Sequence, residues 1–388
     1  MFEMSFPTEK QLRDRFDRSE HAVYFATADK RTRYYGFGVR EEKFGADFQD
    51  VAAWAREQRY PVFGGFLFDE QSVTDSALMN GYFVLPEVLY DITDQHLWGR
   101  ETDPFGAPTP IAGPAITSQT DEYDWPDRVQ TAVDDMQQNP NHQKVVLGRQ
   151  RQVRLTGKLN LATLLADLAT QQPNSYHFVL KRGDEVFVSA TPERLAKVNR
   201  GQFETAGVAG TIRRGIDEAE DARLATELLQ DPKNLQEHAY VVETIVSRLQ
   251  DVATLTLPDG PQIMKNPQVQ HLYTPIAGQL NGDNTVLALA ERLHPTPALG
   301  GKPVDWAMAT IQTIDQHPRG LFAGPIGVVK PDGDGEMIVG IRSMWLKQRT
   351  ATLFAGAGIL ADSDVQAEFE ETGLKMTPMM NLLKEQDK

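Results

Sequence analysis

Acidic side chains at helical spacing are the first candidates for chemistry in this chain. Glu368 and Glu371 lie three residues apart in DVQAEFEETGLKM, which places both carboxylates on one face of a helix, with Lys375 one turn beyond Glu371. Glu237 lies on a second helical segment, 233–251, beside an apolar stripe expected at Leu235, Ala239, Val242, Ile245 and Leu249. Carboxylates from two helices would suit Mg2+, a hard ion that takes oxygen ligands. The alternative for each acid is a solvated helix face with an ion pair.

Two further charged residues stand at the ends of predicted strands. Lys144 opens the apolar run KVVLGRQ, and Glu193 follows Pro192 in SATPERLAK, just past a strand. Residues in such places are usually exposed to solvent. Position alone therefore assigns no role to either side chain.

The sequence does not support two patterns that would indicate other chemistry. The segment GAGILA (356–361) matches the loose dinucleotide fingerprint, but Asp362 and Asp364 follow it and would place carboxylates beside a pyrophosphate. The eight histidines form no HExxH or similar metal spacing. Dinucleotide binding and zinc hydrolysis are therefore unsupported, whereas the glycine pair still allows backbone to approach a small ligand.

Composition narrows the function classes further. The chain has 388 residues and a formal net charge of −15, the wrong sign for general nucleic-acid binding. It has no cysteine, which excludes disulfides, thiolate nucleophiles and cysteine-ligated metal centres. The first twenty residues alternate charges, and no apolar run is long enough to span a bilayer. We expect a cytoplasmic protein with neither a nucleic-acid nor a membrane partner.

The elements that must position these residues alternate between hairpins and helices. Residues 1–98 read as short strands with one helix near 46–58, and residues 99–121 read as a Pro- and Gly-rich loop. Helices are predicted at 124–138, 160–171, 217–230 and 233–251, and strands at 144–155, 176–181, 185–190, 269–280, 336–347 and 350–356. The pattern predicts an α+β fold with antiparallel sheet. We expect 1–121 to be a β-rich part of the same compact unit as 122–388.

Eight segments, in order, resemble the chorismate-utilising enzymes, which include isochorismate, salicylate, anthranilate and aminodeoxychorismate synthases. They are KVVLGR (144–149), SATPERL (189–195), AGVAGTIRRG (206–215), KNLQEH (233–238), HPTPALGG (294–301), RGLFAGPIG (319–327), IRS (341–343) and GAGILADSDVQAEFEETGLK (356–375). FGGFLFD (63–69) and FVLPEVL (83–89) also resemble the stand-alone isochorismate synthases. The resemblance implies large antiparallel sheets packed around the active site, with helices outside, and it implies that 122–388 is the chorismate-binding catalytic region.

The resemblance also implies a substrate and a cofactor. Chorismate is the expected substrate, and Mg2+ is expected to be held by Glu237 and Glu371, with Glu368 as a near or water-mediated contact. Asn234 stands where many members carry another acid, so that charge is missing here.

Two positions bear on the nucleophile. Lys144 matches the lysine of the water-adding members, which implies that water attacks and that Lys144 is the base, with Glu193 as the acid. Burial must then raise the pKa of Glu193 to keep it protonated. Ala209 stands where many aminodeoxychorismate synthases have a nucleophilic lysine, and the chain has no glutamine-amidotransferase segment. Neither a covalent adduct nor an amidotransferase partner is expected.

The remaining substrate contacts are implied by the same segments. Arg342 resembles the arginine that binds a carboxylate, Lys375 a second cation, and His294 a residue that contacts the ring. The implied backbone N–H donors are at Gly210, Thr211, Gly356 and Gly358. Phe322 stands where the family commonly has Tyr, so one hydroxyl contact is missing here.

The resemblance therefore favours an isochorismate synthase, an isomerase that most naturally supplies menaquinone biosynthesis, although a siderophore pathway uses the same chemistry. The runner-up is a salicylate synthase, which eliminates pyruvate from isochorismate in the same site. A catalytically silent family member is the third reading. It is disfavoured because Lys144, Glu193, Glu237 and Glu371 are retained together.

Overall fold

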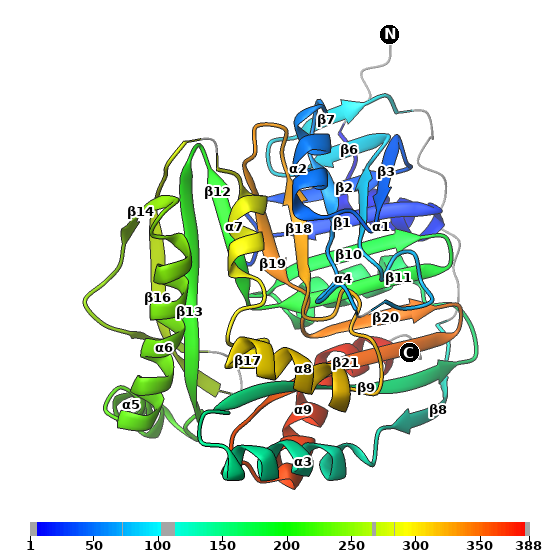
Figure 1. Ribbon diagram of the computed structural model, residues 1–388. Helices are drawn as coiled ribbons and strands as arrows, with labels where there is room; N and C mark the ends of the chain where they lie inside the picture. The colour runs from blue at the N-terminus through cyan, green and yellow to red at the C-terminus, as the bar shows by residue number, and fades with distance from the viewer. Residues whose placement is uncertain (1–5, 72, 102–112, 266–268, 283, 385–388) are drawn as a thin grey trace.

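Two large antiparallel sheets dominate the computed structural model, which describes residues 6–71, 73–101, 113–265, 269–282 and 284–384 (Figure 1). Within these residues the first sheet has eleven strands. Its order is β17 (Gly301–Lys302), β9 (Lys144–Leu155), β21 (Thr350–Ile359), β20 (Ser343–Lys347), β11 (Glu185–Thr191), β10 (Tyr176–Arg182), β1 (His21–Ala26), β2 (Arg33–Phe37), β6 (Val88–Asp91) and β7 (His96–Gly99), with β8 (Ile116–Asp121) also paired to β9.

The second sheet has ten strands in the same described residues. Its order is β14 (Ala253–Thr256), β16 (Val269–Leu280), β13 (Gln202–Arg213), β12 (Arg194–Asn199), β19 (Gly335–Val339), β18 (Pro325–Val329), β4 (Val62–Gly65), β5 (Tyr82–Leu85) and β3 (Glu41–Phe44), with β15 (Gln262–Lys265) paired to β16. The expected α+β fold with large antiparallel sheets and outer helices is thus confirmed.

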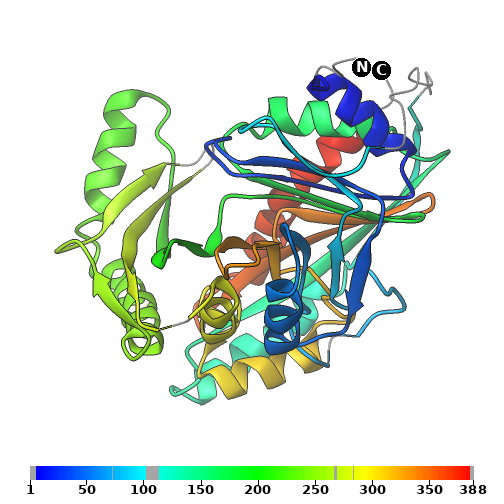
Figure 2. The same ribbon diagram turned by 90° about the horizontal axis from the view of Figure 1, so that it is seen from above.

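Helices cover the outside of this pair of sheets. They are α1 (Glu9–Arg18), α2 (Phe48–Arg56), α3 (Trp125–Gln138), α4 (Leu161–Gln171), α5 (Glu218–Leu228), α6 (Pro232–Leu249), α7 (Val286–Leu293), α8 (Val304–Ile314) and α9 (Val365–Lys384). Seen from above, α1, α4 and α9 lie together along one face of the first sheet (Figure 2). Their apolar faces form one core with that sheet, including Leu12, Leu164 and Met379, all fully buried. A larger core lies between the two sheets.

The amino-terminal strands are built into both sheets. β1 pairs with β10, and β4 pairs with β18, so each sheet joins strands from distant parts of the sequence. The predicted loop at 99–121 falls partly outside the described residues. Its last part is a strand and not a loop, because β8 pairs with the far half of β9 and extends that sheet.

The helix α6 differs from its expected packing. Its N-cap is Asp231, whose side chain accepts a hydrogen bond from the Asn234 N–H, and Pro232 occupies the first turn. We expected an apolar stripe at Leu235, Ala239, Val242, Ile245 and Leu249, whereas the buried residues are His238, Val241, Ile245 and Leu249. The buried face of α6 is thus rotated by about one residue from the expected face, and Glu237 lies at its edge.

Candidate active site

Two chain crossovers between the sheets lie side by side. Strand β11 of the first sheet continues into β12 of the second through Pro192 and Glu193, and β19 of the second continues into β20 of the first through residues 340–342. The Ala190 N–H donates to the Arg342 carbonyl (3.0 Å), and the Val339 N–H donates to the Glu193 carbonyl (3.1 Å). The fold thereby brings the expected acid and the expected carboxylate-binding arginine to neighbouring turns.

The second crossover corrects the single strand predicted at 336–347. The chain breaks at Gly340, where a Cβ atom would lie 2.4 Å from the Leu321 carbonyl oxygen, and Arg342 follows with φ of +48°. This left-handed conformation is uncommon for a residue other than glycine, and it turns the chain into the other sheet. The turn therefore sets the backbone position from which the Arg342 side chain extends.

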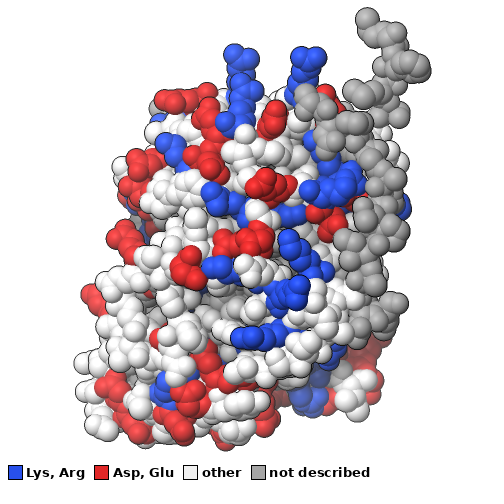
Figure 3. Space-filling model, turned by 90° about the vertical axis from the view of Figure 1, so that its right-hand side faces the viewer, with Lys and Arg blue, Asp and Glu red and all other residues white. Residues whose placement is uncertain are grey.

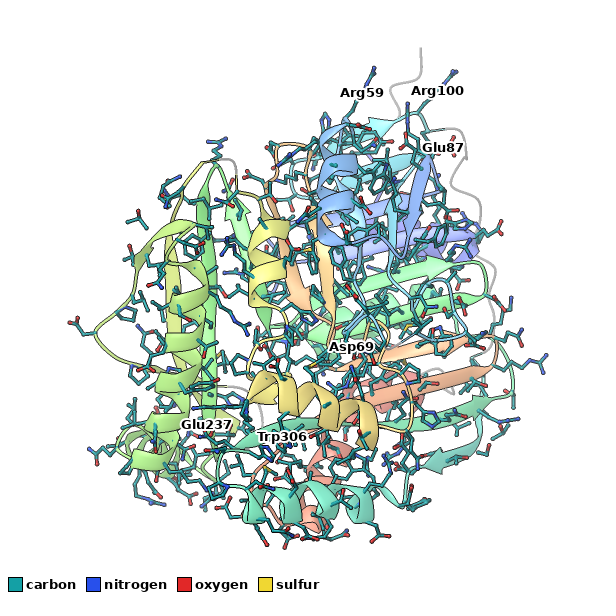
Figure 4. All side chains as sticks on the ribbon, in the orientation of Figure 1. Arg59, Asp69, Glu87, Arg100, Glu237 and Trp306 are labelled. Carbon is teal, nitrogen blue, oxygen red and sulfur yellow. The ribbon has the colours of Figure 1, made fainter. Side chains whose placement is uncertain are left out.

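Lys144 and Glu237 are in direct contact, although Lys144 lies on β9 of the first sheet and Glu237 lies on helix α6. The Lys144 Nζ donates to Glu237 Oε1 at 2.7 Å, and both side chains are partly buried. Figure 4 shows Glu237 on α6 in the lower part of the molecule, the side where α8 lies. The expected base and an expected metal ligand thus form one ion pair.

Gly358 makes room for the Lys144 side chain. It lies on β21, whose Gly358 pairs with Val146 of β9, and a Cβ atom on Gly358 would lie 2.9 Å from the Lys144 Cε. Real Cβ contacts are almost never so short. Gly358, whose backbone was expected to approach the substrate, therefore also borders the aliphatic part of the Lys144 side chain.

Glu193 has the perturbed acidity that the expected acid needs. Burial raises the pKa of Glu193 to about 7, against the opposing effect of the Lys144 charge. Within the described residues no hydrogen bond or ion pair joins Glu193 to Lys144, whose Nζ is paired with Glu237. Glu193 is thus a buried carboxyl group that can hold a proton near neutral pH.

Arg342, Glu371 and Lys375 form the other part of the site. Burial lowers the pKa of Arg342, and the charge of Glu371 opposes that shift. Within the described residues no hydrogen bond or ion pair engages the Arg342 guanidinium. Lys375 was expected to contact substrate, but here its Nζ lies 2.7 Å from Glu371 Oε1 and donates to the Gly356 carbonyl (2.9 Å).

Glu368 lies in a region of crowded negative charge. Burial raises the pKa of Glu368, the charge of Glu371 raises it further, and the Ser363 hydroxyl donates to Glu368 Oε1 at 3.1 Å. A cation between the acids would relieve this repulsion.

The chemistry of the acids fits Mg2+, since carboxylate oxygens are the ligands that this ion prefers. In the described part of the chain, however, no three acidic or histidine side chains converge as a ligand set. The two expected metal ligands are each neutralised by a lysine, Glu237 by Lys144 and Glu371 by Lys375.

Gly210 and Thr211 lie at a bulge in β13. Gly210 has φ of +77°, and the register of β13 against β16 shifts between Ala209 and Thr211. The Thr211 N–H, expected to bind substrate, donates instead to Asn234 Oδ1 at 3.2 Å. Asn234 thus joins the first turn of α6 to this bulge, at the position where the family's further acid is missing.

His271 is a site residue that we did not single out from the sequence. Its Nδ1 lies 2.9 Å from the Thr211 hydroxyl, and burial lowers its pKa while the charges of Lys375, Arg342 and Glu371 also act on it. The signal is the pairing of Thr211 with His271 in neighbouring strands, which a single sequence does not reveal.

His294 packs against Phe68, and its expected contact with the substrate ring stays a prediction. Its Nε2 is 2.7 Å from the Phe68 carbonyl oxygen, its ring meets the Phe68 ring edge to face, and burial lowers its pKa to about 4. The described contacts link it to Phe68, not to Lys144 or Glu193. Phe322 is buried, stacks on Phe354 and lies beside Gly356, so its ring contributes packing.

Charge on the surface does not single out the site. On the face shown in Figure 3, acidic and basic side chains are interspersed, and the chain as a whole is negative. An anionic ligand must therefore be bound by local cations such as Arg342. Across the described residues, no helix combines the length and the apolar character needed to cross a membrane.

Comparison with known proteins finds similar sequences among the isochorismate synthases. Isochorismate synthase MenF of Bacillus subtilis (strain 168) is 40% identical over 270 residues, which is 69% of this chain and 57% of that protein. The chain therefore aligns with little more than half of that relative's length.

Two solved structures share the fold. MenF, the menaquinone-specific isochorismate synthase from Escherichia coli, superposes with a TM-score of 0.84 at 24% identity, covering 98% of this chain and 92% of that one. DhbC from Bacillus anthracis, described as a putative 2,3-dihydroxybenzoate-specific isochorismate synthase, gives 0.80 at 27% identity, covering 97% and 99%.

The sequence profile of one enzyme family extends over most of the region that carries the candidate site. The family described as "Chorismate binding enzyme" matches residues 106–384, well over half of the chain. The chain belongs to the chorismate-binding enzyme family.

Proposed function

We propose that the protein is an isochorismate synthase, a Mg2+-dependent isomerase that converts chorismate to isochorismate. The observation that carries the proposal is the buried carboxyl group of Glu193, whose pKa is raised to about 7 and whose turn lies beside the turn that carries Arg342. An acid that still holds its proton near neutral pH is what the departure of the C4 hydroxyl requires. The name of the Bacillus subtilis relative supports the same reaction.

The reaction balances with two proton transfers. Lys144 must first lose the proton that it carries in its ion pair with Glu237. Water then attacks C2 of chorismate and gives its proton to the neutral Lys144 amine, the two ring double bonds shift, and the C4 hydroxyl leaves. Glu193 protonates that hydroxyl, so it departs as water. At neutral pH a pKa of about 7 leaves a large share of Glu193 protonated and ready to donate.

The substrate is a dianion, and cations must hold both of its carboxylates. The Arg342 guanidinium is suited to bind one of them through two parallel hydrogen bonds. Glu237 and Glu371 would hold Mg2+, with Glu368 nearby, and when bound the ion neutralises the other carboxylate. The crowding of Glu368 by Glu371 supports this assignment.

Menaquinone supply and a cytoplasmic location complete the proposal. The Escherichia coli structure that superposes best of the two above is called menaquinone-specific, and the chain has no cysteine, which suits a reducing compartment. The enzyme works on a small molecule without a glutamine-amidotransferase subunit.

Product analysis tests the proposal. Purified protein is incubated with chorismate and Mg2+, and the products are identified by NMR over time. We expect isochorismate to accumulate until it equilibrates with chorismate. Stoichiometric salicylate and pyruvate would instead assign the salicylate synthase reaction, and unchanged chorismate would refute both.

A further inference from the structure

One stripe of α6 contacts the first sheet at β9, at β17 and in the turn that follows β21. Lys233, Glu237 and Tyr240 are spaced i, i+4 and i+7, which places them on one face of the helix. Their partners follow the strand order β21, β9 and β17. Helix α6, which runs alongside β13 and β16 of the second sheet (Figure 1), therefore also reaches the first sheet through this stripe.

Each contact in this stripe is short. Lys233 Nζ lies 2.7 Å from Asp362 Oδ2, just after β21, and Glu237 accepts from Lys144 of β9. The Lys302 Nζ of β17 lies 3.7 Å from the centre of the Tyr240 ring. Glu237 is thus flanked on one side by a contact with the turn after β21 and on the other by a contact with β17.

Asp362 belongs to the turn that leads into α9. The neighbouring Ser363 donates its hydroxyl to Glu368, and the carbonyl of Ala361 accepts from Gln137 Nε2 at 2.9 Å. The Lys233–Asp362 pair therefore links the first turn of α6, which precedes Glu237, to the turn that precedes Glu368 and Glu371.

We propose that Lys233 and Asp362 are positioning residues whose ion pair sets the placement of Glu237 relative to Glu368 and Glu371. The inference deepens the proposed function and rests on its assignment of these acids to Mg2+. Neither Lys233 nor Asp362 needs to touch the substrate, because both act through the helices they join.

The pair is exposed, at 66% for Lys233 and 69% for Asp362, so it adds little to overall stability. We expect its effect on ligand binding, because a small displacement of one acid weakens the binding of an ion that several acids share. A direct charge effect has the opposite sign at Lys233: replacing a cation by an anion near the acids should attract Mg2+ more strongly. The two explanations can therefore be separated.

The experiment compares Lys233→Glu, Asp362→Lys and the double variant that swaps the charges. Binding of Mg2+ alone is measured by calorimetry, and KM and kcat for chorismate are measured in parallel. We expect each single variant to weaken Mg2+ binding and raise KM by about two- to fivefold, with kcat within about twofold. The swapped variant should return both values to near wild type.

Arg292→Glu is the matched control, because it reverses one charge of another exposed pair, Arg292 with Asp251 at 3.0 Å. It should leave Mg2+ binding and KM unchanged. Tighter Mg2+ binding by Lys233→Glu, no rescue by the swap, or a wild type that does not bind Mg2+ would each overturn the positioning role. If Mg2+ binding changes across the variants as expected but the wild-type protein forms no isochorismate, only the proposed function is refuted.

Discussion

The Nζ atom of Lys144 lies 2.7 Å from Oε1 of Glu237, so the proposed base and a proposed metal ligand share one contact. A change at either residue therefore alters the surroundings of the other. Variants at these two positions must be judged by which step they affect, binding or turnover.

Lys144→Gln should abolish water addition, because the amide keeps a polar side chain of similar length but cannot accept the proton. We expect kcat to fall by roughly 10²- to 10⁴-fold with an almost unchanged Tm, since Lys144 is partly exposed. Turnover is followed by isochorismate formation. Wild-type turnover in this variant would mean that another group is the base.

Glu193→Gln should lose turnover while still binding chorismate, because the amide cannot supply the proton. In the wild type, kcat/KM should fall as the pH rises through about 7, since deprotonation removes the acid. Glu204→Gln, which changes a half-exposed acid in β13, is the control and should keep the wild-type pH profile. A profile that stays flat up to pH 9 would remove Glu193 from this role.

Gly358→Ala should reduce activity more than stability. The added methyl group would lie 2.9 Å from the Lys144 Cε, so the flexible lysine would move away from Glu237 while the strands stay paired. Gly260→Ala is the control, because no atom lies within 4 Å of its added Cβ. Equal activities of the two variants would show that Lys144 tolerates the displacement.

Removal of Mg2+ should stop the reaction. Glu371→Ala should weaken Mg2+ and chorismate binding together, because the ion joins protein and substrate. Calorimetry with Mg2+ in the absence of substrate separates the two effects. Full activity in excess EDTA contradicts the metal assignment.

Arg342→Ala should raise KM with a smaller effect on kcat, since the guanidinium has no partner among the described residues and is free to bind a carboxylate. Arg342→Lys should recover only part of the affinity, because an ammonium group cannot form two parallel hydrogen bonds. An unchanged KM in Arg342→Ala places this residue outside the substrate site.

Local pattern predicted the regular elements well. Long runs of β-forming residues predicted β9 at 144–155 and β16 at 269–280, each with the same bounds in the structure. The single strand predicted at 336–347 was wrong, because one half is a buried strand and the other a mostly buried one, and local pattern does not reveal that the chain changes sheets between them. That change depends on Gly340 packing against the Leu321 carbonyl, a contact between distant segments.

The same limit applies to the candidate site. Glu371 and Lys375 could be paired from the sequence because both lie on one helix, and the structure has their ion pair. The proximity of Thr211 and His271 depends on the register between β13 and β16, including a bulge at Gly210. Family resemblance supplied the residues of the site, but not the contact between Lys144 and Glu237.

The interleaving of early and late strands has a consequence for how this chain is made. The fragment that matches the family, 106–384, would leave β10 without β1 and β18 without β4, and so would present an open edge on each sheet. Open edges of this kind invite pairing with other chains. Such a fragment should aggregate, and during synthesis the first hundred residues must wait for partners that emerge much later from the ribosome.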